Sequence, residues 1–231
     1  TMMKTIRFGF VVVLLMMVST SVQAFSWGKF WKIESPDKKT QVKVQTLNYR
    51  WLHWSMTHNG VPVLERSEIN ILIDDVFDVF TKGGLGKVTN RRQVRTQFAT
   101  PFYKKSVVKD EYNSMTVSFK NGISVEFRVY NDGAAYRFLL DRNIMSEVTS
   151  ETAKFHFADD YPAFVPYVND NRGGERYCYS FESYYDEQQL SQMFADSLAI
   201  TPLAVSLPGG MKAIVMDAGV EDYPGMDMKS I

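Results

Sequence analysis

The fold is decided by the stretch Arg128-Val129-Tyr130-Asn131-Asp132-Gly133-Ala134-Ala135-Tyr136-Arg137-Phe138, in which two strand-like runs meet at a short polar turn. Before the turn, apolar and polar residues alternate over 123–129, which is the pattern of a half-buried strand. After it, apolar residues resume over 135–139. Asn131-Asp132-Gly133 tolerates the positive φ angles of a tight turn. The stretch therefore predicts an antiparallel hairpin.

Similar signals recur on both sides of this hairpin. Asn59-Gly60 and Asn121-Gly122 are turn sequences between apolar runs, so 112–140 is expected to form three consecutive antiparallel strands. Other strands are expected over 41–47, 51–57, 61–64, 69–73, 201–207 and 212–218, and a solvated strand or loop over 88–98. About ten to twelve short strands favour an all-β fold, an antiparallel β-sandwich with meander or Greek-key connections. Only 186–198 has helical spacing, which allows one or two short helices at most.

The composition excludes one class of partner. The 231 residues include 26 Lys and Arg against 26 Asp and Glu, so the formal net charge is zero. A neutral chain without a basic run lacks the electrostatic signature of a nucleic-acid-binding protein. The apolar fraction of 45% is sufficient for a sizeable core.

Residues 1–24 are expected to form a signal peptide rather than part of the fold. Lys4 and Arg7 precede an apolar run over 8–18, and Val22-Gln23-Ala24 has the small residues of a cleavage site. The run is shorter than the roughly 20 residues of a membrane-spanning helix. We expect cleavage after Ala24, no membrane span in the mature protein, and a periplasmic or secreted location.

The residues alone do not assemble a catalytic set. Gly83-Gly84-Leu85-Gly86 lacks the Gly-Lys-Ser/Thr ending of a phosphate-binding loop, and no Gly-x-Ser-x-Gly, His-Glu-x-x-His or Cys-x-x-Cys pattern is present. Cys178 is the single cysteine and has no neighbouring His, so it is read as an ordinary thiol. No catalytic or cofactor-binding residue is predicted in this chain.

Carboxylates are the remaining chemical candidates. Pairs of carboxylates serve as acid and base in glycoside hydrolysis, but the reaction depends on their separation in space. Each of the pairs in this sequence is expected to be a solvated turn. They are Asp74-Asp75, Asp159-Asp160, Asp186-Glu187 and Glu221-Asp222, with Glu182 nearby in a tyrosine-rich segment. That segment, 169–187, lacks any regular period and is expected to be a long ordered loop of the kind that carries function.

Several motifs occur together in the order of one family. They are Ser35-Pro36-Asp37, Tyr112-Asn113, the stretch over 128–137, Thr201-Pro202-Leu203 and Asp222-Tyr223-Pro224-Gly225-Met226. In this combination the chain, from about Ser35 to Met228, resembles the amino-terminal domain of glycoside hydrolase family 97. The resemblance implies a sandwich of the galactose-mutarotase-like, super-sandwich kind over 25–231. It also implies that the chain is part of an exported bacterial α-glucosidase or α-galactosidase, which hydrolyses terminal α-linked sugars. Such enzymes are common in gut Bacteroidetes.

The resemblance also implies how the work is divided within such an enzyme. The family places its catalytic carboxylates on a (β/α)8 barrel, and no barrel sequence is present here. This chain alone is therefore expected to be inactive and to be part of a longer protein. A calcium ion is bound at the barrel site, and the family's sandwich contributes one glutamate to it. Glu182, in Phe181-Glu182-Ser183-Tyr184-Tyr185, falls at the matching place. One carboxylate is too few for calcium, which takes six to eight oxygen ligands.

One departure from the family pattern and two alternatives remain. The family often has His-Glu-Ala where this chain has Met216-Asp217-Ala218, which places a contact to the barrel or the sugar in question. The first alternative is a free-standing carbohydrate-binding sandwich without catalysis, in which Trp51, Trp54 or the tyrosines over 177–185 would stack on sugar rings. The second is a structural or surface-assembly sandwich without a ligand.

Overall fold

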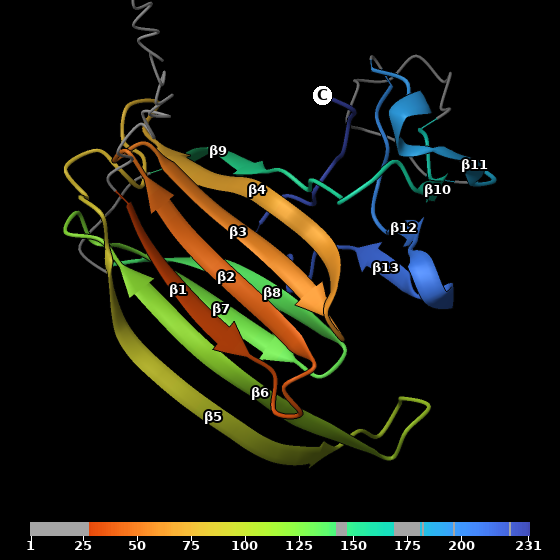
Figure 1. Ribbon diagram of the computed structural model, residues 1–231, viewed down its shortest axis with the longest axis horizontal. Helices are drawn as coiled ribbons and strands as arrows, with labels where there is room; N and C mark the ends of the chain where they lie inside the picture. Colours follow the sequence, from red (N-terminus) through yellow and green to blue (C-terminus); the bar gives the residue numbers. More distant parts are fainter. Residues whose placement is uncertain (1–27, 142–146, 169–180, 182, 196, 222) are drawn as a thin grey trace, which may run out of the picture.

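The structure is a computed structural model that describes residues 28–231 except 142–146, 169–180, 182, 196 and 222. Its strands form three antiparallel sheets (Figure 1). The predicted signal peptide lies outside the described residues. Among the described residues, no helix is long and apolar enough to cross a bilayer.

The first sheet has five strands in the order β1-β2-β3-β4-β9. Its strands are β1 (Gly28–Glu34), β2 (Thr40–Leu47), β3 (Trp51–His58), β4 (Val61–Ile73) and β9 (Val148–Ala153). Alternate residues of β2 are buried, including Val42, Val44 and Thr46. The two apolar runs predicted over 61–73 are one continuous strand, whose pairing with β3 contains register shifts near Met56.

The second sheet is the meander predicted around the central stretch. Its strands are β5 (Lys87–Ala99), β6 (Val107–Ser118), β7 (Ile123–Tyr130) and β8 (Gly133–Leu140), in that order. Tyr130 pairs with Gly133, so Asn131 and Asp132 form the turn as predicted. However, none of residues 131–133 has a positive φ angle. The turn therefore does not use the left-handed backbone for which its residues were expected.

The third sheet is smaller. Its strands are β10 (Pro162–Val165), β11 (Asp186–Gln189), β12 (Leu203–Ser206) and β13 (Lys212–Val215), in the order β11-β10-β12-β13. The only helices among the described residues are two 3-10 turns, η1 (Leu190–Gln192) and η2 (Pro208–Gly210). The helix suggested by spacing over 186–198 is thus wrong: the segment begins as an edge strand on β10 and continues as η1.

The core lies between the first two sheets, which face each other (Figure 1). Trp54 of β3 is only 5% exposed. Its ring centroid lies 6.4 Å from that of Phe127 on β7 and 5.9 Å from that of Tyr136 on β8. Since the inward residues of both sheets are apolar at alternate positions, each sheet buries one face on the other. The all-β sandwich predicted from the sequence is confirmed.

Candidate functional site

The segment predicted to carry function connects β10 to β11 in the third sheet. Glu182, the predicted calcium ligand, lies outside the described residues. Its described neighbours include the half-buried Phe181 and the exposed Tyr184 and Tyr185. Tyr184 is 92% exposed, and the Tyr185 ring makes an edge contact with Phe181 at 5.7 Å between centroids.

The buried Tyr167 side chain lies where the residues before and after this segment meet. The Tyr167 hydroxyl accepts hydrogen bonds from the Gln188 side chain at 2.6 Å and from the Phe194 backbone N–H at 2.9 Å. Its ring packs on the Phe194 ring at 5.2 Å. Gln188 follows the segment and Tyr167 precedes it, so one side chain fixes both ends of the connection.

Asp160 connects the chain before β10 to η1. Its carboxylate accepts the Ser191 hydroxyl at 2.7 Å and the Ser191 N–H at 2.8 Å. These two hydrogen bonds lower the pKa of Asp160 below its usual value, and the bond from the Ser191 hydroxyl has the larger effect. Its neighbour Asp159 accepts the backbone N–H of Asp160. Both residues of the pair are exposed, as expected for a solvated turn, and their carboxylates also accept local hydrogen bonds that the sequence did not predict.

Asp217 joins two of the family motifs. Its Oδ1 accepts the Thr201 hydroxyl at 2.7 Å, and its Oδ2 accepts the Met226 N–H at 2.9 Å. Partial burial raises the pKa of Asp217, but these hydrogen bonds outweigh it and leave the pKa below the usual value. Asp217 lies where the family often has the Glu of His-Glu-Ala. Through its two hydrogen bonds it connects Thr201-Pro202-Leu203 to Pro224-Gly225-Met226.

Glu151 of β9 connects the same last motif to the central stretch. One of its oxygens accepts the Tyr223 hydroxyl at 2.8 Å and the other accepts the Tyr136 hydroxyl at 3.3 Å. Burial and then the bond to Glu151 raise the pKa of Tyr223 to about 12. Burial is also the main reason for the raised pKa of Tyr136. Both phenols therefore stay protonated at neutral pH and act as donors.

Ser35-Pro36-Asp37 is joined to the central hairpin. The Asn131 side-chain oxygen accepts the Asp37 N–H at 3.0 Å, and the Ser35 hydroxyl donates to Asp37 at 2.6 Å. The Thr40 hydroxyl donates to the Asn131 carbonyl at 3.1 Å. Residues of the motifs that carried the family resemblance therefore form hydrogen bonds between elements that are distant in sequence.

The other sugar-stacking and metal candidates are placed as follows. Trp54 belongs to the core, so its prediction as a sugar-stacking residue is wrong, whereas Trp51 is 45% exposed. Asp74 and Asp75 occupy a turn with positive φ angles, as expected for solvated turn residues. Within the described ranges, no three His, Cys, Asp or Glu side chains gather closely enough to hold a metal ion.

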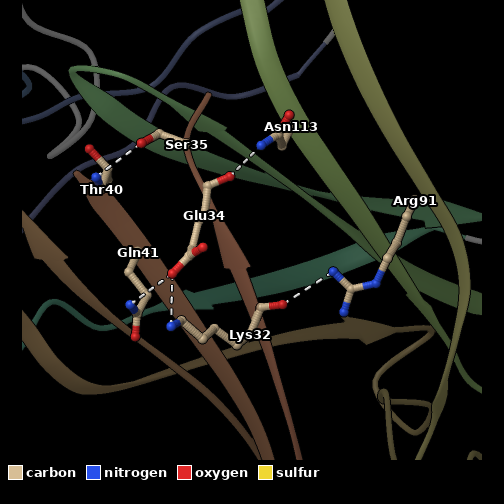
Figure 2. A network of polar contacts seen from close by, with 7 residues as sticks. All are labelled: Lys32, Glu34, Ser35, Thr40, Gln41, Arg91 and Asn113. Atoms are coloured by element: carbon tan, nitrogen blue, oxygen red, sulfur yellow. Dashed lines mark hydrogen bonds and ion pairs between the residues drawn. The ribbon is translucent and has the colours of Figure 1, made fainter. Parts of the chain in front are cut away.

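A polar groove that the sequence did not predict lies where the outer edge of β1 approaches β5 and β6 (Figure 2). It has a volume of about 610 Å3. The Arg91 guanidinium donates to the Lys32 carbonyl at 3.1 Å, and the Asn113 amide donates to the Glu34 carbonyl at 2.6 Å. The contributing residues come from three segments, and therefore no single run of the sequence signals the groove.

Comparisons with known proteins agree on one family. A sequence profile described as "Glycosyl-hydrolase 97 N-terminal" matches residues 33–231. A retaining alpha-galactosidase of Bacteroides thetaiotaomicron is 32% identical over 227 residues, which cover 97% of this chain and 33% of the relative. The chain thus spans about a third of the length of the curated relative that it matches.

Solved structures show the same fold. A glycoside hydrolase family 97 enzyme from Pseudoalteromonas sp. strain K8, in complex with acarbose, superposes with a TM-score of 0.66 at 20% identity. The match covers 86% of this chain and 30% of the enzyme's chain. A beta-arabinopyranosidase has a TM-score of 0.73 at 21% identity, with 87% of this chain and 33% of its own covered. With the profile match over most of its length, this chain belongs to glycoside hydrolase family 97, of which it carries the N-terminal region.

Proposed function

We propose that this chain is the sandwich region of an exported α-glycosidase that hydrolyses terminal α-linked sugars. Its role in that enzyme is structural: it supplies a scaffold and one wall of the sugar-binding site. The observation that carries the proposal is the family match over residues 33–231, together with 32% identity to an alpha-galactosidase. The described joints at Asp217, Glu151 and Asn131 support the structural role, because they hold the family motifs together rather than exposing them.

The test is hydrolysis by the product of the complete gene. Sequencing beyond the codon for Ile231 establishes what the gene encodes, and the full product is then assayed with p-nitrophenyl α-galactoside and α-glucoside. We expect release of p-nitrophenol from at least one of them. A full product that hydrolyses neither, yet binds α-linked oligosaccharides, would replace this proposal with a carbohydrate-binding function.

Glu182 is proposed as one carboxylate ligand of a calcium ion in the complete enzyme. Calcium binds carboxylate oxygens from several segments, and the described residues contain no metal-binding cluster of their own. The proposal takes the remaining ligands from the catalytic barrel of the complete enzyme. In the full product, Glu182→Gln is expected to weaken calcium binding by tenfold or more, whereas Glu187→Gln serves as the control. Equal calcium affinity of both variants would remove Glu182 from the ligand set.

Export is proposed from the sequence of residues 1–24. The positive charges at Lys4 and Arg7, the apolar run and the small residues before Phe25 support it. Amino-terminal sequencing of the protein from the periplasmic or secreted fraction should begin at Phe25. Recovery of the uncleaved chain in the cytosol would contradict export.

A further inference from the structure

The open edge of β1 is covered by side chains of the second sheet. Among the described strands, β1 pairs only with β2, so the carbonyls on its other side have no neighbouring strand in that part of the chain. Arg91 of β5 donates to the carbonyl of Lys32, and Asn113 of β6 donates to that of Glu34, two residues further along the same edge. Figure 2 shows both bonds reaching across the groove. Unpaired edge carbonyls would otherwise invite strand addition.

The groove has an excess of positive charge. The lining residues include five cationic ones, Lys32, Lys38, Arg91, Arg92 and Arg95, against the single carboxylate of Glu34. Arg92 lies on the opposite face of β5 from Arg91 and Arg95, so four cationic side chains remain on the groove side or in the loop beside it. The carboxylate is already paired with Lys32 at 2.8 Å, and this bond lowers the pKa of Glu34. Glu34 therefore offers little compensation to the arginines.

The two arginines that face β1 bond only to neutral acceptors among the described residues. Arg91 and Arg95 share one face of β5, because successive side chains of a strand alternate. Arg95 donates to the Tyr112 carbonyl at 2.8 Å and to the Asn113 side-chain oxygen at 2.9 Å. Neither arginine forms an ion pair with a carboxylate in the described part of the chain. These bonds orient both guanidinium groups without neutralising them.

We propose that this groove binds the carboxylate or sulfate groups of an acidic oligosaccharide. A guanidinium group presents parallel N–H donors that match the oxygens of such anions. The volume lies in the range of small-ligand sites. Apart from Pro36 and the buried Ile33, the lining is polar. A protein interface would present an apolar or aromatic centre. The choice of a sugar as carrier rests on the proposed function, but the binding requires no hydrolysis.

The test is calorimetric titration of the purified chain at low salt. The probes are α-1,4-linked trigalacturonate, a sulfated trisaccharide of similar length, and neutral maltotriose. Either acidic sugar is expected to bind, and the tighter one identifies the anionic group. Raising the salt concentration to 1 M should weaken the binding, because the screening length shrinks to about 3 Å.

Paired variants assign the binding to the groove. Arg91→Gln with Arg95→Gln is expected to lower the affinity by about tenfold or more. Arg91→Lys with Arg95→Lys keeps the charge and should retain part of the affinity. Arg66→Gln with Lys87→Gln removes the same charge outside the groove lining and should change little. Thermal unfolding of each variant verifies that the fold persists.

Three outcomes would overturn the inference. They are the absence of binding by either acidic sugar, binding of maltotriose as tight as theirs, and affinity that is indifferent to the Arg91 and Arg95 substitutions. Tighter binding of a hexaglutamate peptide than of trigalacturonate would assign the groove to an acidic protein segment instead. None of these results depends on the hydrolysis assay, so failure here and failure of the proposed function are distinguishable.

Discussion

At the residue scale, single polar side chains connect parts of the fold that are distant in sequence. Asp217 is the clearest case, because one carboxylate bonds to both Thr201 and Met226. From the sequence it stood out only as a departure from a His-Glu-Ala pattern. Its partners could not be predicted, since a sequence does not give the meeting of three separate segments.

Asp217→Asn should destabilise the protein. The amide keeps the shape of the side chain but replaces one acceptor oxygen with a donor group, which then faces the Met226 N–H or the Thr201 hydroxyl. We expect a loss of about 1–2 kcal/mol in the free energy of unfolding at neutral pH. Urea denaturation measures it. Asp75→Asn is the control, because the Asp75 side chain is exposed and Asn also tolerates its positive φ of 60°.

The effect of Asp217 should depend on pH in a defined direction. Its pKa is lowered in the folded protein, so the unfolded chain takes up the proton first as the pH falls. Its contribution is therefore complete above about pH 4 and is lost as the pH falls through the folded-state pKa. The urea midpoints of the wild type and of Asp217→Asn should converge on acidification below pH 4. A difference that stays constant down to pH 2.5 would contradict this account.

The two neighbouring tryptophans should respond differently to truncation. Trp54→Ala leaves a cavity between the two sheets, with an expected loss of about 3–5 kcal/mol in unfolding free energy. Trp51 is 45% exposed, so Trp51→Ala should cost much less. Thermal and chemical denaturation of both variants measure the difference. Equal losses would mean that Trp54 does not hold the two sheets together.

At the element scale, the strands and hairpins could be predicted where local pattern and tertiary packing agree. The alternation over 123–129 and the Asn59-Gly60 turn, with φ angles of 50° and 79°, are examples. The prediction failed over 186–198, where apolar spacing suggested a helix. There, pairing of β11 with β10 satisfies the backbone, and only η1 remains helical. Tertiary pairing outweighed a weak local signal.

The turn between β4 and β5 offers a matched pair of glycines. Gly84 and Gly86 both have positive φ angles, of 72° and 71°. A Cβ at Gly84 would meet no atom within 4 Å, whereas one at Gly86 would lie 3.0 Å from both Phe119 and Val117 side chains. Gly84→Ala should therefore cost about 1–2 kcal/mol of backbone strain. Gly86→Ala should cost about 1–3 kcal/mol more, because it also overpacks the core. Urea denaturation compares them, and equal costs would contradict the described packing.

Asn121 connects the β6–β7 hairpin to the same turn. Its side-chain nitrogen donates to the carbonyls of Asp78, Val79 and Thr81, each at 3.0 Å. Asn121→Ala leaves these carbonyls without their donor, so we expect faster hydrogen exchange over 78–83 and a loss of about 1–3 kcal/mol in stability. Asn90→Ala, in the exposed strand β5, is the comparison. Unchanged exchange over 78–83 would show that Asn121 does not hold the turn.

At the scale of the whole molecule, the sequence predicted the class of fold and the family better than the sites. Motifs such as Ser35-Pro36-Asp37 were recognisable in the sequence. Their role in connecting distant elements depends on the hydrogen bond to Asn131, which only the structure shows. The groove could not be predicted, because Lys32, Arg91 and Arg95 come from strands of different sheets. Glu182 remains a prediction, since it lies outside the described residues.

The central proposal is that this chain is the scaffold region of an α-glycosidase whose catalytic groups lie elsewhere. It is tested most directly by measuring p-nitrophenyl α-glycoside hydrolysis by the purified chain beside the product of the complete gene. The account predicts hydrolysis by the complete product and none by the chain alone. Comparable hydrolysis by the chain alone would contradict the scaffold role, and the absence of hydrolysis from both would contradict the glycosidase assignment.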